Sequence, residues 1–254
     1  MTSLEIVPLL GMPLIRAGDD LVELIALALK RNGVTLFSGD VLVVAQKIVS
    51  KAENRVVDLA TIKPSEQAIA LATDVDKDAR LVEVILSESV RIVRARRGVL
   101  IVEHRLGFIM ANAGVDQSNV APGDGSQHVL LLPENPDRSA ETLRRGLTAV
   151  TKTEIAVVIN DSFGRPWRRG TAGVAIGVAG LPALIDLRGR PDLFGRALEV
   201  SIIGFADEVA AAASLLMGQA DEALPVVLIR GLRWTAPASA AATIVRSPNE
   251  DLFR

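Results

Sequence analysis

Short apolar runs alternate along the chain with longer amphipathic stretches. The short runs are rich in Val and Ile and are bounded by Gly, Pro or Asp, a pattern typical of β-strands. The longer stretches repeat apolar residues at the three-and-four spacing of one buried helix face. Strands and helices do not alternate strictly. The sequence therefore predicts an α/β or α+β fold with a mixed sheet, distinct from a P-loop or Rossmann fold.

The pattern also sets the expected boundaries of the elements. Pro136 should end one element, Asp137 should cap the helix that follows, and Gly218 should end the last long helix. The expected strands are Leu4–Leu9, Val41–Ala45, Arg91–Arg94, Val99–Glu103, Val129–Leu132, Ile155–Ile159, Val200–Gly204 and Val226–Ile229. The expected helices are Asp19–Arg31, Pro64–Ala72, Lys77–Ser87, Ser139–Val150 and Phe205–Met217.

Length and composition are those of an ordinary globular protein. The 254 residues are 49% apolar and 23% charged, enough to bury a core without disulfides or a structural metal. We expect a single domain over residues 1–254, with two lobes meeting near the loop 121–127, APGDGSQ. The chain has no cysteine, which excludes disulfides, thiolate metal sites and cysteine nucleophiles and is compatible with a reducing cytoplasm.

Nucleic-acid and membrane functions are not expected. The net charge of −2 gives no broad basic field, and the cluster of Arg91, Arg94, Arg96 and Arg97 is interpreted as a solvated strand face. The N-terminus lacks the features of a signal peptide. The apolar stretch Thr171–Ile185 contains glycines and a proline and is shorter than the ~20 residues of a transmembrane helix, so we expect it in the core.

Several common catalytic motifs are absent from the sequence. It contains no G-x-x-x-x-G-K-[ST] loop, no G-x-G-x-x-G after a strand and no G-x-S-x-G elbow. His104 and His128 are expected to be ordinary surface residues. Chemistry must then come from carboxylates, Lys, Arg and backbone N–H groups, a set that suits metal-assisted phosphoryl transfer.

Three polar segments in the first half of the chain are candidates for ligand binding. Gly11–Asp20 runs into a helix; it could cradle a nucleotide, or Asp19 or Asp20 could simply cap that helix. Lys47 and Lys51, within Gln46–Arg55, follow a strand and could reach phosphates, or they could belong to a solvated charged face. The loop Asn112–Val120 could bring an acid to a cation, or it could form a simple Asx turn.

Two further segments lie in the second half. Asn160–Gly170 places Asp161 and Ser162 at the end of an apolar strand, followed by three arginines, which suits a metal beside phosphate better than a core. Leu215–Gln219, at a helix end, says little on its own.

Taken in order, these segments resemble the coenzyme F(420)-0:L-glutamate ligase family. The matching stretches are GMPLIRAGDDL, VVAQKIVSKAENR, NAGVDQSNV with LLPENPDRSA after it, VINDSFGRPWRRG with AIGVAG, and ADEVAAAASLLMGQ. They extend from Gly11 to about Gly231. Each stretch is weak alone, but five in register are specific.

The resemblance implies a cytoplasmic enzyme that joins L-glutamate to coenzyme F(420)-0, and to F(420)-1 as a further acceptor. GTP would phosphorylate the terminal carboxylate to an acyl phosphate, and the glutamate amine would then displace phosphate, leaving GDP. Two Mg²⁺ or Mn²⁺ ions per site are implied, with K⁺ as a further candidate. The family fold is a mixed α/β arrangement seen as an intertwined homodimer.

The resemblance also assigns residues. The implied metal ligands are Asp116, Asp161, Ser162 and Gln219. The implied nucleotide contacts are Met12, Pro13, Leu14, Ile15, Gln46, Lys47, Lys51, Asn119 and the region Leu215–Glu222, including Met217 and Gly218. The residues expected to take part in catalysis are Lys51, Asp116, Asp161 and Arg165.

Some positions depart from the family pattern. Threonine is frequent in the family where this chain has Asn160 and Ser162, and glycine is frequent at Asn54. Gln46 and Lys47 replace a small hydroxyl pair of some members, a change that bears on the choice of nucleotide. The chain stops at Arg254, so we expect no C-terminal flavin-reductase-like domain. Two alternatives stay open: a carboxylate–amine ligase for another cofactor, and a non-catalytic nucleotide- or deazaflavin-binding protein.

Overall fold

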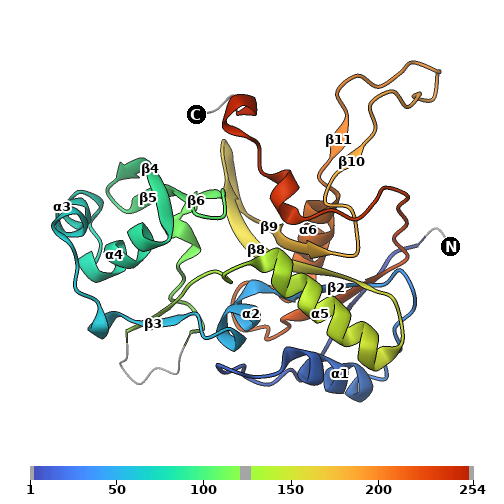
Figure 1. Ribbon diagram of the computed structural model, residues 1–254, viewed down its shortest axis with the longest axis horizontal. Helices are drawn as coiled ribbons and strands as arrows, with labels where there is room; N and C mark the ends of the chain where they lie inside the picture. The colour runs from blue at the N-terminus through green and yellow to red at the C-terminus, as the bar shows by residue number, and fades with distance from the viewer. Residues whose placement is uncertain (1–2, 121–126, 252–254) are drawn as a thin grey trace.

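A five-stranded mixed sheet forms the centre of the molecule (Figure 1). The computed structural model describes residues 3–120 and 127–251. Strands β2 and β8 run parallel, and the other neighbouring pairs run antiparallel. The expected mixed α/β architecture is therefore confirmed. In spatial order, the strands are β1 (Glu5–Pro8), β12 (Val226–Arg230), β2 (Val41–Ala45), β8 (Ala156–Arg165) and β9 (Arg168–Ala179).

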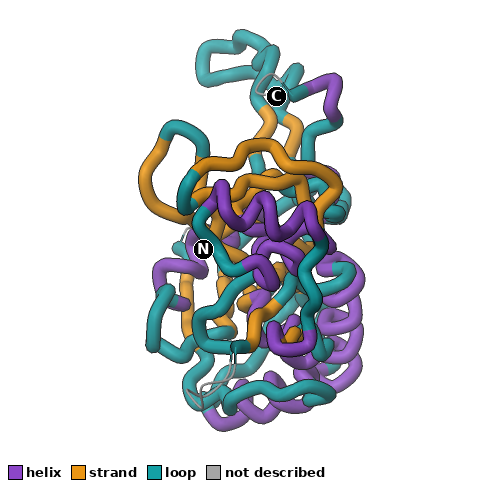
Figure 2. Tube along the Cα trace, turned by 90° about the vertical axis from the view of Figure 1, so that its left-hand side faces the viewer, coloured by secondary structure: helices purple, strands orange, loops and turns teal. Residues whose placement is uncertain are grey.

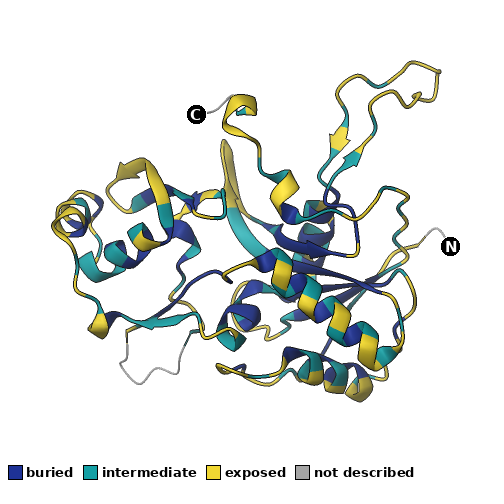
Figure 3. Ribbon diagram, in the orientation of Figure 1, coloured by how far each residue is buried: buried dark blue, intermediate teal, exposed yellow. Residues whose placement is uncertain are grey.

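Both faces of this sheet are covered, which explains why the central parts of its inner strands, Val41–Ala45, Ala156–Ile159 and Val226–Ile229, are apolar. Successive residues of a strand point to opposite faces. In β2, Leu42 and Val44 pack in the core shared with helices α1 (Leu21–Arg31), α2 (Gln46–Ala52) and α5 (Pro136–Thr151). Val41 and Val43 pack in the core shared with α6 (Phe205–Met217). Figure 3 shows the strands as a buried layer between these helices.

Residues 56–120 and 127–131 form a body of their own, which we call the insert; the rest of the described chain is the sheet body. A separate apolar cluster fills the insert. Figure 2 views the molecule from the side of the insert. It contains β3 (Val56–Asp58), η1 (Leu59–Thr61), α3 (Glu66–Val75), α4 (Ala79–Ser87), β4 (Ser89–Arg96), β5 (Val99–His104), β6 (Ile109–Ala111), η2 (Asn112–Gly114) and β7 (His128–Leu130). Of the loop 121–127, where we expected two lobes to meet, all but Gln127 lies outside the described residues.

The expected elements recur with shifted ends. β2 and α6 have the predicted bounds, and Gly218 ends α6 as predicted. Residues 46–52 form a helix that the sequence pattern did not predict. β8 continues to Arg165, beyond the predicted end at Ile159, because its polar residues pair with β9 in a long hairpin. The predicted strand Val200–Gly204 shortens to β11 (Ile202–Ile203), paired with β10 (Ile185–Asp186).

The start of α5 differs from the prediction. Asn135 is the N-cap, since its Oδ1 accepts a hydrogen bond from the Arg138 N–H at 3.0 Å, and Pro136 begins the helix. The Asp137 carboxylate turns outward from α5. It accepts hydrogen bonds from the N–H groups of Val178 (2.8 Å), Ala241 (2.8 Å) and Ala242 (3.2 Å). Asp137 thus joins α5 to β9 and to the C-terminal turn η3 (Ala241–Ile244).

Two expectations about exposure are corrected or refined. His104 is fully buried rather than a surface residue, because β5 packs it against the α4–β4 junction. The apolar stretch Thr171–Ile185 is largely buried by α5 and α6 within the chain, as expected of core. The arginines of β4 are exposed, as predicted. No helix within 3–120 or 127–251 is both long and apolar enough to cross a membrane.

Replacing Asp137 should destabilise the protein more than replacing the true cap. Asp137→Ala leaves three N–H groups without their carboxylate and should lower the free energy of unfolding by about 2–4 kcal/mol. Asn135→Ala removes a single capping bond and should cost about 1 kcal/mol. Urea denaturation of both variants measures the difference, and equal losses would contradict the assigned roles.

Candidate functional site

The parallel pair of strands β2 and β8 brings the candidate residues to one edge of the sheet. Ala45, the last residue of β2, is level with Asn160 of β8. Helix α2 starts immediately after Ala45 and carries Lys47, whereas Asp161 follows Asn160 directly. Residues separated by more than a hundred positions in the sequence therefore meet at the carboxyl ends of two adjacent strands.

Asp116 reaches this edge from the insert. Its Oδ2 lies 2.8 Å from Lys47 Nζ, and its Oδ1 accepts hydrogen bonds from the N–H (2.7 Å) and hydroxyl (2.8 Å) of Ser118. Burial alone would raise the pKa of Asp116, but these hydrogen bonds and the charge of Lys47 outweigh it and lower the pKa. The Asx turn is therefore confirmed, and it orients the acid toward α2. The ligand-binding interpretation of this loop stays a prediction.

Asp161 has the opposite electrostatic balance. The pKa of Asp161 is raised to about 7, chiefly because its carboxyl is removed from water. The hydrogen bond from the Ser162 N–H lowers this pKa, and the negative charge of Asp116 raises it further. Lys47 opposes the shift only weakly, as the last contribution. Asp116 and Asp161 are thus close enough to repel, and Lys47, which is paired with Asp116, does little to offset the burial of Asp161.

Lys51 stands one helical turn after Lys47, on the same side of α2. Its Nζ donates to the Asn119 carbonyl at 2.6 Å. Burial and the nearby charge of Lys47 lower the pKa of Lys51. Two ammonium groups held side by side make a favourable position for an anionic ligand.

The segment after α6 closes the site. Asn119 Nδ2 donates to the Ala220 carbonyl at 2.9 Å, which places Gln219 and Gly218 beside the Asp116 loop. Gly218 has a φ of +68° and a ψ of −170°, a backbone conformation that residues with a Cβ rarely adopt. The position therefore requires glycine.

Asn160 is a connection that the sequence did not suggest. Its amide group donates to Ser214 Oγ at 2.9 Å and approaches Met217 Sδ at 3.3 Å. The strand carrying Asp161 is thereby fixed to the end of α6, where Met217 precedes Gly218. The only signal in the sequence was a polar residue at the end of an apolar strand.

Several predicted site residues are not gathered at the acids. Gln46 is only 2% exposed, and its Oε1 accepts a hydrogen bond from Ser50. Arg165 lies further along β8 than Asp161, at the exposed end of the hairpin with β9. The loop of Met12, Pro13, Leu14 and Ile15 buries Ile15 and exposes Leu14. The ligand contacts of these residues stay predictions.

The donor set suits a hard divalent cation. Within the part of the chain that the structure describes, no three His, Cys, Asp or Glu side chains gather to hold a metal by themselves. Asp116 and Asp161 can be complemented by the hydroxyl of Ser162 and the amide oxygen of Gln219, all oxygen donors of the kind that Mg²⁺ and Mn²⁺ prefer. The uncompensated carboxyl of Asp161 is the observation that fits such an ion.

Comparison with known proteins identifies the family. The model of F(420)-0:gamma-glutamyl ligase matches residues 10–231. The chain belongs to this family. It is 48% identical to the coenzyme F(420):L-glutamate ligase of Methanothermobacter thermautotrophicus, with 96% of each chain covered. It is also 48% identical to the ligase of that name from Methanopyrus kandleri, over 94% of this chain and 93% of the relative.

The family relationship extends to a third relative. The coenzyme F(420):L-glutamate ligase of Archaeoglobus fulgidus is 42% identical, with coverage of 98% of this chain and 96% of the relative. The expected family and the expectation that the chain is an enzyme of the ligase class are both confirmed.

Removing the charge of Asp161 should stabilise the metal-free protein at neutral pH. The native carboxyl keeps its proton up to about pH 7, whereas the unfolded carboxyl loses it near its ordinary pKa of 3.8. The native state therefore binds more protons between these values, and wild-type stability should fall as the pH rises from about 4 to about 7.

Asp161→Asn cannot ionise and should lack this decrease. In excess chelator at pH 8 it should be more stable than wild type by at least about 1 kcal/mol. Thermal unfolding from pH 4 to pH 8 measures the effect. If the difference in melting temperature between the two proteins is the same at every pH in this range, ionisation of Asp161 does not destabilise the protein.

Proposed function

We propose that this protein joins L-glutamate to coenzyme F(420)-0 with GTP as the phosphoryl donor, and that F(420)-1 can serve as a further acceptor. The observation that carries the proposal is the meeting of Lys47 and Lys51 with Asp116 and Asp161 at one sheet edge. Paired ammonium groups beside paired carboxylates suit a nucleotide phosphate bound through divalent cations. The relatives named above carry the corresponding ligase name.

A carboxylate must be activated before it can form an amide, because oxide is a poor leaving group and phosphate a good one. In the proposed reaction, an oxygen of the F(420)-0 carboxylate attacks the γ-phosphorus of GTP, and the bond to the β-phosphate oxygen breaks, releasing GDP. The glutamate nitrogen then attacks the acyl carbon, loses a proton and expels phosphate.

The residues of the site have distinct proposed tasks. Asp116, Asp161, Ser162 and Gln219 would hold two Mg²⁺ or Mn²⁺ ions, which neutralise phosphate charge when bound. Lys51 would contact a phosphate directly. Its ammonium group donates to the neutral Asn119 carbonyl, so its charge is available to an anionic ligand. Lys47 would orient Asp116 through their 2.8 Å ion pair.

The test is incubation with glutamate-free coenzyme, L-glutamate, GTP and Mn²⁺, followed by mass spectrometry. The wild type should yield a product heavier by one glutamyl unit and release one phosphate per product. Lys51→Ala removes one phosphate contact while keeping the fold, and should lower kcat/KM for GTP by about 10²-fold, the scale of losing one charge-assisted contact.

A wild type that binds GTP without releasing phosphate would instead be a non-catalytic nucleotide-binding protein. A protein that consumes GTP only with a different acceptor would be a ligase for another cofactor. An unchanged kcat/KM in Lys51→Ala would remove Lys51 from the phosphate site while leaving the ligase activity intact.

We also propose that the protein works as a homodimer. Residues 185–203, which we call the arm, extend from the sheet body as a narrow ladder (Figure 1). Its side chains include Leu193 (98% exposed), Phe194 (95%) and Val200 (84%). Apolar side chains this exposed favour a protein interface. The arm, rather than the buried stretch Thr171–Ile185, offers the apolar surface for a second copy.

Light scattering at low micromolar concentration should give twice the 27.0 kDa of one chain. Phe194→Asp places a charge at the tip of the arm and should shift the mass toward the monomer. Leu4→Asp, at an exposed apolar residue outside the arm, is the matched control and should not change the mass. A wild-type mass of one chain would refute the dimer.

A further inference from the structure

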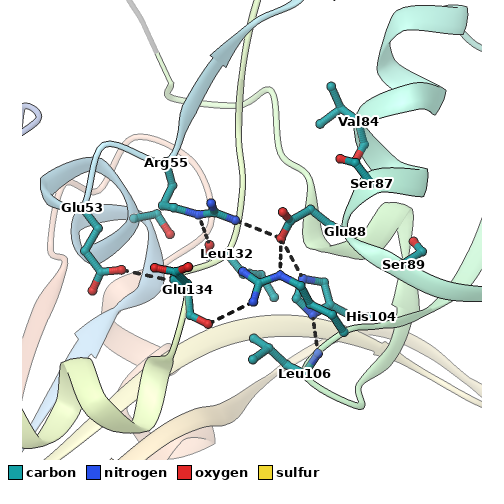
Figure 4. Close-up of polar contacts among 12 residues, drawn as sticks. Glu53, Arg55, Val84, Ser87, Glu88, Ser89, His104, Leu106, Leu132 and Glu134 are labelled. Atoms are coloured by element: carbon teal, nitrogen blue, oxygen red, sulfur yellow. Dashed lines mark hydrogen bonds and ion pairs between the residues drawn. The ribbon is translucent and has the colours of Figure 1, made fainter. Parts of the chain in front are cut away.

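A buried carboxylate lies at the junction of the two bodies, apart from the acids of the site. Glu88 follows α4 and is only 8% exposed. Its Oε2 lies 2.9 Å from Arg55, as drawn in Figure 4. The same oxygen lies 3.0 Å from Arg105. Burial would raise the pKa of Glu88, but His104 and the two arginines outweigh it and lower the pKa to about 2. Glu88 is therefore a carboxylate at neutral pH.

His104 completes the surroundings of this carboxylate. Its Nδ1 accepts a hydrogen bond from the Leu106 N–H at 2.9 Å, so the neutral ring carries its proton on Nε2. Nε2 lies 3.4 Å from Glu88 Oε2, close to the carboxylate but outside hydrogen-bond geometry. The ring is fully buried and orients the turn that follows β5.

The two arginines connect Glu88 to the sheet body. Arg55 is fixed to the end of α2 by its N–H bond to the Ser50 carbonyl, and its Nε donates to the Leu132 carbonyl at 2.9 Å. Arg105 donates to the Glu134 carbonyl at 3.2 Å, just before α5. The Glu88 carboxylate thus joins the insert to both chain segments that lead into and out of it.

The turn after His104 reaches the strand that carries Asp161. Phe108 packs edge-on against Phe163, with ring centroids 5.7 Å apart and planes at 77°. Phe163 lies two positions after Asp161 in β8. The turn is closed by hydrogen bonds from the Gly107 and His104 N–H groups. Glu88 holds it through Arg105, whose guanidinium pairs with the carboxylate and whose N–H donates to the Glu88 carbonyl. Displacement of the turn would therefore also displace Phe163, which lies beside Asp161 in β8.

The site itself needs this junction, because its two acids come from different bodies. Asp116 belongs to the insert, whereas Lys47 and Asp161 belong to the sheet body. The direct bonds between the bodies at the site are polar and partly exposed. Lys47 pairs with Asp116 and donates to Ser118, and Asn119 accepts from Lys51 and donates to the Ala220 carbonyl. Such bonds contribute little rigidity by themselves.

We propose that Glu88 is a positioning residue: by clamping Arg55 and Arg105 it fixes the insert against α2 and β8, and so holds Asp116 in register with Lys47 and Asp161. The inference that this register serves metal binding rests on the function proposed above. The register itself does not, and can be measured without metal.

Glu88→Gln keeps the shape of the side chain and removes its charge. Glu141→Gln is the matched control, because Glu141 also pairs with two arginines and has its pKa lowered to about 2, but all three residues lie within α5. In metal-free protein, amide hydrogen exchange over residues 115–120 should be at least about tenfold faster in Glu88→Gln than in wild type. It should be unchanged in Glu141→Gln.

Mn²⁺ binding, followed by the electron paramagnetic resonance of the free ion, gives the second measurement. Glu88→Gln should weaken binding about tenfold, whereas kcat at saturating Mn²⁺ and GTP should change less than about threefold. In an Asp116→Asn background, Glu88→Gln should have no further effect on Mn²⁺ affinity, because both substitutions act on the same ligand. A general loss of stability would instead add to the effect of Asp116→Asn.

The outcomes separate the two proposals. Unchanged exchange over residues 115–120 in Glu88→Gln overturns the positioning role, whatever the metal does. A wild type that binds no Mn²⁺ overturns the proposed metal site, and exchange then still decides the role of Glu88. If Glu88→Gln fails to fold, Phe108→Leu removes the aromatic contact more gently, and it should accelerate exchange in the same segment.

Discussion

The parallel backbone hydrogen bonds between β2 and β8 align Ala45 with Asn160, and the site is built outward from this pair. Because parallel strands end at the same edge, the helix after one strand and the polar residues after the other must meet there. Both strands are buried between helices, so their register is fixed by the apolar residues that face each core. The positions of Lys47 and Asp161 follow from that register, because each lies one or two residues after the pair.

The two acids at this edge of the sheet have different electrostatic surroundings. Asp116 is satisfied by Lys47 and Ser118 and has a lowered pKa, whereas Asp161 is desolvated and has its pKa raised to about 7. Burial and the negative charge of Asp116 therefore both disfavour the ionised form of Asp161. The two lysines stand close together on α2: Lys47 is paired with Asp116, and Lys51 donates to the Asn119 carbonyl.

Much of the scaffold could be read from the sequence. Val41–Ala45 and Phe205–Met217 have the predicted bounds, since a run of buried residues and an alanine-rich stretch ending in glycine are strong local signals. Asp137 and His104 were misjudged. A local pattern cannot show that backbone N–H groups of β9 and η3 will surround Asp137, or that α4 and β5 will bury His104.

The sequence by itself determined the family and the types of side chain available for chemistry: no cysteine, few histidines, and acids and lysines next to apolar strands. Those features depend only on which residues are present and on which residues lie next to one another in the chain. The tertiary structure decided which of them meet. Asp116 reaches Asp161 because an insert with its own core is fastened to the sheet body through Glu88, and such long-range packing leaves no periodic trace in the chain.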